Sequence, residues 1–436
     1  MAVAADAPRV ALRTLGCKVN RAESESLAES LRSLGVAVGD DPGPAGTIVV
    51  NTCTVTAEAD AKARKEVRRA LAATLGTVVV TGCLAALEAG MLRALGDRVV
   101  VVSDRESLHA TVAGILGVGD VSGGKQPATA PGAASRACGT FRTRALVKVQ
   151  DGCDNRCAYC IVPDARGLPR SVPAPDILRR VEALRAAGTA EIVLTGVNLG
   201  RYTDGAAAPD LAALIEILAK TGIARIRLSS IEPPDLTERL LSVLGRTAAV
   251  APHLHVPLQS GSDRTLSRMG RRYDTRAYSD ALARARAALP GVAVTTDVIA
   301  GFPGETDADA ADSLAFVAHC GFAKLHVFRY SKRAGTPAAS ADGQVAPPVK
   351  AERARALREL GGALEIAYAA GRDGQGADLL VEAVSEGVAH GTTGDHLRVA
   401  VRYPGAHAGD LVPVRLALDD DGSLRGYYVE ETRART

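Results

Sequence analysis

Short apolar segments alternate with amphipathic helical segments along most of this chain of 436 residues. In the first part of the chain the strand candidates are 9–14, 47–51, 77–82 and 98–102. Strands that alternate with helices pair in parallel through right-handed crossovers. The alternation therefore predicts an α/β fold that begins with a small, doubly wound parallel sheet in residues 1–117.

The first helix candidate, at 20–35, has start and stop signals of its own. Asn20 can cap its N-terminus, Glu23 stands three residues later, and Gly35 follows its last apolar residue. We therefore expect a helix directly after the first strand.

The middle of the chain repeats the alternation of strand and helix six times. The strand candidates are 144–150, 191–196, 225–230, 253–259, 292–302 and 324–330. Six such units predict a partial (βα)6 barrel over residues 144–371. Ligands of such folds collect beyond the C-terminal ends of the strands.

Two further segments differ from this pattern. Residues 118–143 are rich in Gly, Ala, Pro and Ser and are typical of a linker. Residues 372–436 hold short apolar segments broken by Gly, Asp and Pro, which predicts a small all-β module.

Composition limits the class of protein and its compartment. Hydrophobic residues make up 47% and charged residues 23%, and the net charge is only +3, which neither proves nor excludes a nucleic-acid partner. There is no apolar run of about 18 residues, and no basic start followed by an apolar core. We therefore expect a cytoplasmic chain without a membrane partner, where clustered cysteines more often bind metal or react than form disulfides.

Three of the eight cysteines, Cys153, Cys157 and Cys160, share one loop after the first predicted barrel strand. Three thiolates in this spacing can hold three irons of a [4Fe–4S] cluster and leave the fourth iron open for a ligand. The alternative is a zinc site, which requires a fourth Cys or His. The only candidates, His253 and His255, are about a hundred residues away in the sequence.

Cys17, Cys53 and Cys83 each follow a predicted strand of the N-terminal domain. Because the C-terminal ends of parallel strands lie along one edge of a sheet, these three cysteines should converge in space. They predict a second cluster with an open iron. The alternative is three unrelated small core residues, since free cysteine is often buried.

The C-x3-C-x2-C spacing, with Tyr159 before the last cysteine, resembles the signature of the radical S-adenosylmethionine superfamily. This resemblance implies that the amino and carboxylate groups of S-adenosylmethionine bind the open iron. It also implies that cleavage of the sulfonium by a cluster electron releases a 5′-deoxyadenosyl radical.

Two three-cysteine sets in this order, a radical barrel and a terminal β-module together resemble the methylthiotransferases, which end in a TRAM domain. Within that family, "TLGCKVNRAESE" (14–25) and "NTCTVT" (51–56) are most similar to the branch acting on N6-threonylcarbamoyladenosine in tRNA. The first motif usually reads "GCQMN" in the isopentenyladenosine branch and "GCPKN" in the ribosomal-protein branch, and both differ from this chain at Lys18 and Val19.

The resemblance implies transfer of a methylthio group to C2 of the modified adenosine next to the tRNA anticodon. The implied cofactors are two [4Fe–4S] clusters and S-adenosylmethionine, and the implied partners are tRNA and an electron donor such as a flavodoxin or ferredoxin. Alternatives are the same chemistry on isopentenyladenosine tRNA or on a ribosomal-protein side chain. A more remote alternative is a non-catalytic two-cluster electron carrier or sensor.

Residues that end the predicted barrel strands are candidates to bind S-adenosylmethionine. Together with the aromatic residue of the cysteine loop they are Tyr159, Gly196, Asn198, Ser230, Glu232, Gln259 and Ser260. The alternatives are core packing for Tyr159 and loop capping for Asn198 and Gln259.

An arginine could grip the carboxylate of the carbamoyl-threonine group in bidentate fashion. The candidates are Arg166, Arg170, Arg272 and Arg333. The C-terminal module is a poor phosphate surface, because its seven Arg are outnumbered by seven Asp and four Glu, a net charge of −4. Basic contacts to RNA are expected instead from the five Arg of 263–276, which could also form a solvated helical face.

Overall fold

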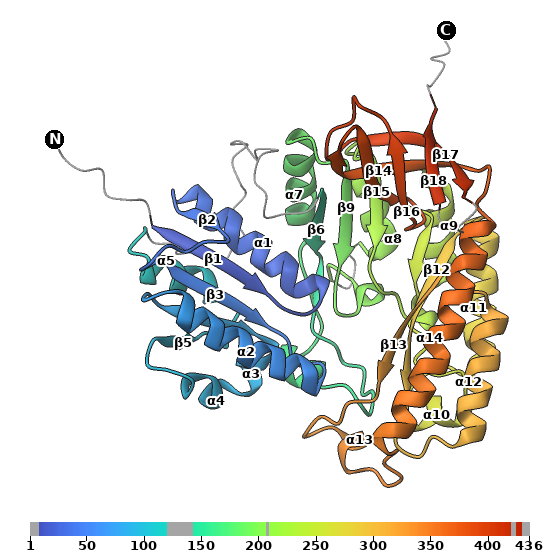
Figure 1. Cartoon of the computed structure of the whole chain (residues 1–436), viewed down its shortest axis with the longest axis horizontal. Coiled ribbons are helices and arrows are strands. Elements are labelled where there is room, and N and C mark those ends of the chain that lie inside the picture. The colour runs from blue at the N-terminus through green and yellow to red at the C-terminus, as the bar shows by residue number, and fades with distance from the viewer. Residues whose placement is uncertain (1–7, 120–142, 206–208, 420–423, 430–436) are drawn as a thin grey trace.

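A computed structural model of the chain describes residues 8–119, 143–205, 209–419 and 424–429. The N-terminal part forms a five-stranded parallel sheet in the order β2-β1-β3-β4-β5 (Figure 1). The strands are β1 (Arg9–Thr14), β2 (Ala37–Gly39), β3 (Thr47–Thr52), β4 (Val78–Gly82) and β5 (Val99–Val101). All pairs being parallel, the C-terminal ends of these strands share one edge.

Helices cover both faces of this sheet, because each buried strand is apolar on both sides. On β3, Ile48 and Val50 face one core and Val49 faces the other. The first core is covered by α2 (Ala57–Ala73), α3 (Cys83–Leu87) and α4 (Ala89–Arg93). The second is covered by α1 (Lys18–Ser33) and α5 (Leu108–Ile115). The predicted doubly wound sheet is confirmed.

The middle of the chain forms an open barrel of six parallel strands. The strands are β6 (Arg144–Lys148), β9 (Glu191–Thr195), β10 (Arg225–Leu228), β11 (His253–His255), β12 (Ala293–Ala300) and β13 (Lys324–Arg329). They form two three-stranded sheets, and a bridge from Ser230 to His255 joins them into the order β6-β9-β10-β11-β12-β13. Within the described ranges β6 and β13 do not pair, so the barrel is open on one side.

Helices cover the outside of this barrel (Figure 1). The long ones are α7 (Ala174–Ala186), α8 (Leu211–Ala219), α9 (Glu238–Arg246), α11 (Thr275–Ala288), α12 (Asp307–Cys320) and α14 (Pro347–Ala370). The short elements are β7 (Gln150–Asp151), α6 (Val162–Arg166), β8 (Arg170–Ser171), α10 (Asp263–Arg268) and α13 (Pro337–Ser340), with 3-10 turns at Leu199–Arg201 and Pro233–Asp235. No helix of the described residues is long and apolar enough to cross a membrane.

The N-terminal sheet domain lies across the open side of the barrel. On one edge, Lys148 of β6 pairs with Glu23 of α1 at 2.8 Å. On the other edge, Arg333, which follows β13, pairs with Asp60 of α2 at 2.7 Å. The edge of the sheet that carries its cysteines therefore faces the barrel.

The C-terminal part forms a closed β-barrel in the order β14-β15-β16-β18-β17. Its strands are β14 (Gly376–Ser385), β15 (Val388–Thr393), β16 (Arg398–Arg402), β17 (Leu411–Leu418) and β18 (Leu424–Tyr428). The predicted small all-β module, of the kind expected for a TRAM domain, is confirmed. Its β-barrel packs beside the strands β9 and β10 (Figure 1), and Arg227 of β10 donates to the carbonyls of Thr393 and Gly394.

Two sequence predictions need correction, and a third concerns residues that the structure does not describe. The first helix begins at Lys18, with Cys17 as its N-cap, so the prediction that Asn20 caps it is wrong. Asn20 lies inside the helix. Its side-chain amide donates to the carbonyls of Leu15 and Thr52, and these two bonds tie the helix to the strand ends. The strand expected at 253–259 ends at His255. Most of the predicted linker lies outside the described residues, and so does Cys138, the one cysteine that it contains.

Candidate functional site

The loop with Cys153, Cys157 and Cys160 follows β7, at the C-terminal end of the barrel strands. Its backbone is held locally, since the Cys160 N–H donates to the Cys157 carbonyl at 3.0 Å. Burial, together with the other two thiols of the loop, raises the pKa of Cys160 to about 12. A bound cation would favour the thiolate form of such a buried cysteine.

Arg271 holds this loop from the opposite side, and sequence reasoning missed it. Its Nη1 donates to Cys157 Sγ at 3.1 Å, and its Nη2 pairs with Glu232. Only 3% of its side chain is exposed, whereas the predicted Arg272 beside it is exposed. The sequence signal was the basic segment 263–276, but an Arg-Arg pair there indicates a solvated face as readily as a buried guanidinium.

Cys17, Cys53 and Cys83 converge at the strand ends, as predicted. The thiols of Cys17 and Cys83 both lie 3.9 Å from Asn20 Oδ1. Cys53 packs against Gly16, where an added Cβ would come within 2.8 Å of Cys53 Sγ. Burial, together with the thiols of Cys83 and Cys17, raises the pKa of Cys53 to about 11.

The donor chemistry of both sets fits an iron–sulfur cluster better than a single ion. The seven described cysteines are all free thiols. In the part of the chain that the structure describes, no group of three or more His, Cys, Asp or Glu is arranged to hold one metal ion. A [4Fe–4S] cluster takes one thiolate per iron, so its ligands stand farther apart than those of one ion. His253 and His255, the residues considered for zinc, both hydrogen-bond Thr295 instead.

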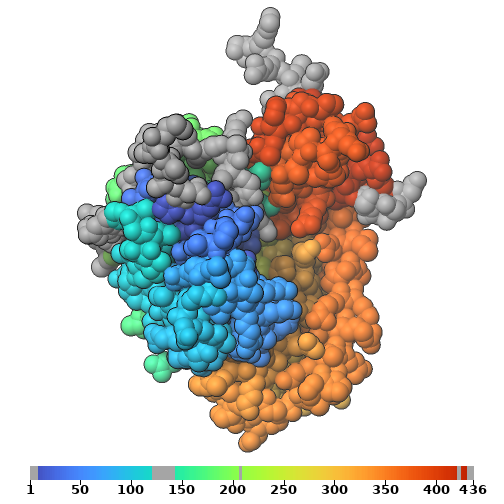
Figure 2. All heavy atoms as spheres, turned by 60° about the vertical axis from the view of Figure 1, so that its left-hand side comes forward, coloured from blue at the N-terminus to red at the C-terminus, as the bar shows by residue number. Residues whose placement is uncertain are grey.

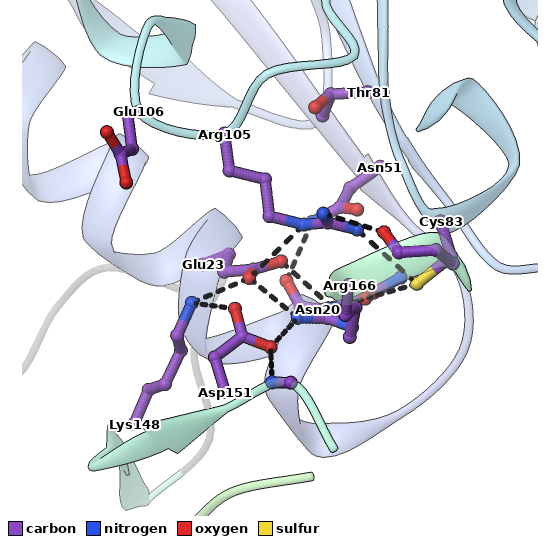
Figure 3. A network of polar contacts seen from close by, with 12 residues as sticks. Asn20, Glu23, Asn51, Thr81, Cys83, Arg105, Glu106, Lys148, Asp151 and Arg166 are labelled. Atoms are coloured by element: carbon purple, nitrogen blue, oxygen red, sulfur yellow. Dashed lines mark hydrogen bonds and ion pairs between the residues drawn. The ribbon is translucent and has the colours of Figure 1, made fainter. Parts of the chain in front are cut away.

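One ionic network joins the two cysteine sets (Figure 3). Arg166 of α6 donates to Asn20 Oδ1, to Glu23 at 3.0 Å and to Asp151 at 2.7 Å. Arg105 donates to Cys83 Sγ at 3.5 Å. Since Asp151 stands two residues before Cys153 and Asn20 three residues after Cys17, the network fixes one cysteine site relative to the other.

The carboxylates of this network are held ionised. Lys148 lies 2.8 Å from Glu23 and 2.9 Å from Asp151. Although burial alone would raise the pKa of Glu23, Lys148 and Arg166 outweigh it and lower that pKa. The same two cations lower the pKa of Asp151.

Asn198, a predicted cofactor contact, lies beside the first cysteine loop. Its N–H donates to Gln150 Oε1 at 2.7 Å, and its Nδ2 lies 4.0 Å from Cys153 Sγ. Its buried Oδ1 has no hydrogen-bond partner among the described residues. A free buried acceptor beside Cys153 suits the ammonium group of an amino-acid ligand. Gly196 is needed for packing, because an added Cβ would come within 2.9 Å of the Gln150 side chain.

The other predicted cofactor contacts divide between the site and the core. Glu232 lines the site, and burial raises its pKa in spite of the nearby guanidinium. Gln259 has a φ of 69°, a strained value for a residue other than glycine and a common feature of binding sites. The Ser260 hydroxyl lies 3.1 Å from that of Ser313 on α12, and so faces the helix layer. Tyr159 packs edge-on against Phe302, which fits the alternative of core packing.

Several of these residues line a small hollow at the mouth of the barrel. Its lining includes Asn155, Cys157, Glu232, Asp235, Arg271 and Arg272. Of the four arginines predicted to contact the substrate, Arg272 is therefore the one that lines this hollow with an exposed side chain. Arg170 is exposed and pairs with Glu106 at 3.5 Å, whereas Arg333 is engaged with Asp60.

Two family models match the chain. Residues 147–317 match the radical SAM superfamily. Residues 9–103 match a family described as uncharacterized protein family UPF0004. Each match covers one of the two parts that carry a three-cysteine set.

Curated relatives match almost the whole chain. The threonylcarbamoyladenosine tRNA methylthiotransferase MtaB of Bacillus subtilis is 36% identical, over 93% of this chain and 93% of the relative. That of Thermotoga maritima is 35% identical, over 97% and 98%. A tRNA-2-methylthio-N(6)-dimethylallyladenosine synthase of Sorangium cellulosum is 34% identical, over 98% and 94%.

Among solved structures, the radical S-adenosylmethionine methyltransferase TsrM of Kitasatospora setae is similar in fold. It aligns with a TM-score of 0.56 over 77% of each chain. At 15% sequence identity this similarity concerns the fold alone.

Proposed function

The chain belongs to the radical S-adenosylmethionine methylthiotransferases, and from this premise we propose that it methylthiolates C2 of N6-threonylcarbamoyladenosine beside the tRNA anticodon. The support is the name of the relatives in Bacillus subtilis and Thermotoga maritima, together with the resemblance of the segments 14–25 and 51–56 to that branch. Because relatives named for dimethylallyladenosine have similar identity, isopentenyladenosine tRNA is the alternative substrate. A ribosomal-protein side chain is a further alternative.

We propose that the chain holds two [4Fe–4S] clusters, one on Cys153, Cys157 and Cys160 and one on Cys17, Cys53 and Cys83. When bound, the first would supply the electron that cleaves S-adenosylmethionine to a 5′-deoxyadenosyl radical, and the second would carry the sulfur that is transferred. The observation that carries this proposal is the convergence of each cysteine set at the face between the N-terminal domain and the barrel.

The residues of the chain then orient the cofactor and exclude water. Asn198 and Glu232 would position the amino acid part of S-adenosylmethionine beside Cys153 and Cys157. The N-terminal domain closes the open side of the barrel, which protects a reactive radical from solvent. A radical is needed because the C2–H bond of adenine has no acidic proton for a general base to remove.

We propose that residues 1–117 form the auxiliary-cluster domain, 118–143 the linker, 144–371 the radical core and 372–436 the TRAM-like domain. The bases of a single-stranded anticodon loop can be splayed out of their stack into the mouth of the barrel. Arg272, which lines the hollow at that mouth, would contact the nucleotide. The reducing electron would come from a flavodoxin or ferredoxin.

The substrate is tested by anaerobic turnover with the reconstituted enzyme. Three substrates are compared, namely tRNA with threonylcarbamoyladenosine, tRNA with isopentenyladenosine, and the ribosomal protein. Mass spectrometry of the nucleosides and peptides should find the added methylthio group only on the first. Product only on the second or third would contradict the substrate and leave the chemistry intact.

The two clusters are tested by two triple variants. Cys153, Cys157 and Cys160 changed to Ala should leave the iron of one cluster and abolish cleavage of S-adenosylmethionine. Cys17, Cys53 and Cys83 changed to Ala should also leave the iron of one cluster, yet retain some cleavage. Wild-type iron content in either variant would remove that set from the proposal.

A further inference from the structure

Lys18 is the first residue of α1, at the edge of the N-terminal sheet that faces the barrel. It stands next to Cys17, and its side chain is exposed. Even so, it interacts electrostatically with Arg227 of β10 and Asp297 of β12, and it influences His396 of the C-terminal β-barrel. Lys18 is thus open to water but surrounded by all three parts of the molecule. Figure 2 shows that the surface is hollowed where these parts meet.

The wall opposite Lys18 is the inner face of β13. Leu325 and Val327 pack in the core beside α14, so the alternate residues His326 and Phe328 point to the inside of the barrel. Both are exposed, and Phe328 exposes 46% of its surface although it is a large apolar residue. An exposed aromatic ring on an inner wall is a surface on which a nucleobase can stack.

The strand register divides this wall into a polar and an apolar half. Asp297 of β12 pairs with His326, and two residues later Ile299 pairs with Phe328. The apolar pair therefore lies nearer the C-terminal strand ends, where the cysteine loop is. The polar pair lies deeper, and Lys18 influences His326 there.

Lys18 lacks an anionic partner of its own. No hydrogen bond or ion pair of Lys18 is found among the described residues, and Asp297 is already 3.3 Å from His255 Nε2. The electrostatic influences of Arg227 and Arg144 on Lys18 are larger than that of Asp297. A lysine ammonium that is unpaired and reachable from the hollow can bind a carboxylate that enters from outside.

We propose that this slot recognises the modified adenine, with the base against Phe328 and Ile299 and the carboxylate of the threonylcarbamoyl group on Lys18. The inference rests on the proposed function and names the specificity residue of that site. A base with an anionic substituent matches a slot that is apolar near the strand ends and cationic below. An isopentenyl group would leave Lys18 without a partner.

The test is equilibrium binding of the reconstituted enzyme to three tRNAs that differ only at the target adenosine, which is threonylcarbamoylated, isopentenylated or unmodified. In Lys18→Met, affinity for the first tRNA should fall roughly 10- to 100-fold, the usual range for a lost charge-assisted hydrogen bond. Affinity for the other two should be unchanged, and Lys18→Arg should restore most of the loss. Phe328→Ala should weaken binding of both modified tRNAs.

Lys62→Met is the matched control, because Lys62 is an exposed lysine of α2 that pairs with Glu58. Lys18→Met should keep the iron content of the wild type, which shows that Cys17 is undisturbed. Equal weakening of all three tRNAs by Lys18→Met would overturn the inference and make Lys18 a phosphate contact. Unchanged binding of all three tRNAs would also overturn it. If the wild type modifies only isopentenyladenosine tRNA, the proposed function itself has failed, and the turnover assay reveals that separately.

Discussion

At the scale of single residues, the position of Cys53 depends on a neighbouring glycine that leaves room for its side chain. Gly16 has a φ of 95°, in the left-handed region that favours glycine. An added Cβ there would lie 2.6 Å from Cys53 Cβ. The site of Cys53 therefore exists only because residue 16 has no side chain.

Gly16→Ala should displace Cys53 and lower the iron content towards that of one cluster, since both the strained φ and the steric clash act at this point. Iron analysis of the reconstituted variant measures this. The control is Gly35→Ala at the other end of α1, where φ is 79° but an added Cβ meets nothing within 4 Å. That variant should lose about 1 kcal/mol of stability and keep its iron. Equal iron loss in both would contradict the role of Gly16.

Arg271 should tune the cluster on Cys157. Arg271→Met removes a hydrogen bond and a positive charge from Cys157 Sγ, which favours the oxidised cluster. The midpoint potential should become more negative, on the order of tens of millivolts. A redox titration followed by electron paramagnetic resonance measures it, with the exposed Arg276→Met as control. An unchanged potential would show that Arg271 serves only to hold the loop.

At the scale of elements, β9 and β10 are joined to the C-terminal β-barrel by buried charges. Glu191 is fully buried and pairs with Arg225 at 3.0 Å and with Arg227 at 2.8 Å. Arg227 also donates to the Gly394 carbonyl at 2.9 Å, and Arg225 to that of Asp378 at 2.7 Å. The C-terminal β-barrel thus completes the hydrogen bonding of the central barrel and is not simply appended to it.

Arg227→Met should destabilise the protein by about 3–5 kcal/mol, because it leaves a buried carboxylate and two carbonyls with fewer partners. Arg246→Met removes the exposed pair with Glu216 and should cost no more than about 1 kcal/mol. Unfolding in urea measures both. Similar losses in the two variants would mean that the buried network adds nothing beyond an ordinary surface pair.

At the scale of the whole molecule, α1 is the element that joins the two larger parts. Leu27 and Leu31 face its own sheet, while Glu25 is buried on another side. Glu25 accepts from the backbone of Leu146 on β6. Burial, with a smaller effect of Glu29, nevertheless raises the pKa of Glu25 to about 7. A carboxyl group where the domains meet therefore keeps its proton up to nearly neutral pH.

This predicts a specific dependence of stability on pH. Between its ordinary pKa of 4.5 and about 7, Glu25 holds a proton in the folded state but not in the unfolded state. The free energy of unfolding contributed by this group is therefore full below that window and falls as the pH rises through it. Glu25→Gln should flatten this part of the profile, and the exposed Glu359→Gln should not. Urea unfolding over the window measures it, and the same slope in Glu25→Gln and the wild type would contradict the assignment.

The sequence by itself determined the elements and the local cysteine loop. Strand and helix periods are properties of neighbouring residues, so the alternation was sufficient to predict the doubly wound sheet and the six-stranded open barrel. Cys153, Cys157 and Cys160 were found because their spacing is local. The convergence of Cys17, Cys53 and Cys83 followed from one general rule, that parallel strands end on the same edge.

Only the tertiary structure decided which side chains from distant segments meet. Asn20 resembles a helix cap in sequence but lies between two cysteines, and Arg271 resembles a surface residue but donates to Cys157. Lys18 gains its surroundings only when the N-terminal domain closes the barrel. Hydrogen bonds and charges act over a few ångströms in space, and periodicity along the chain carries no information about partners a hundred residues away.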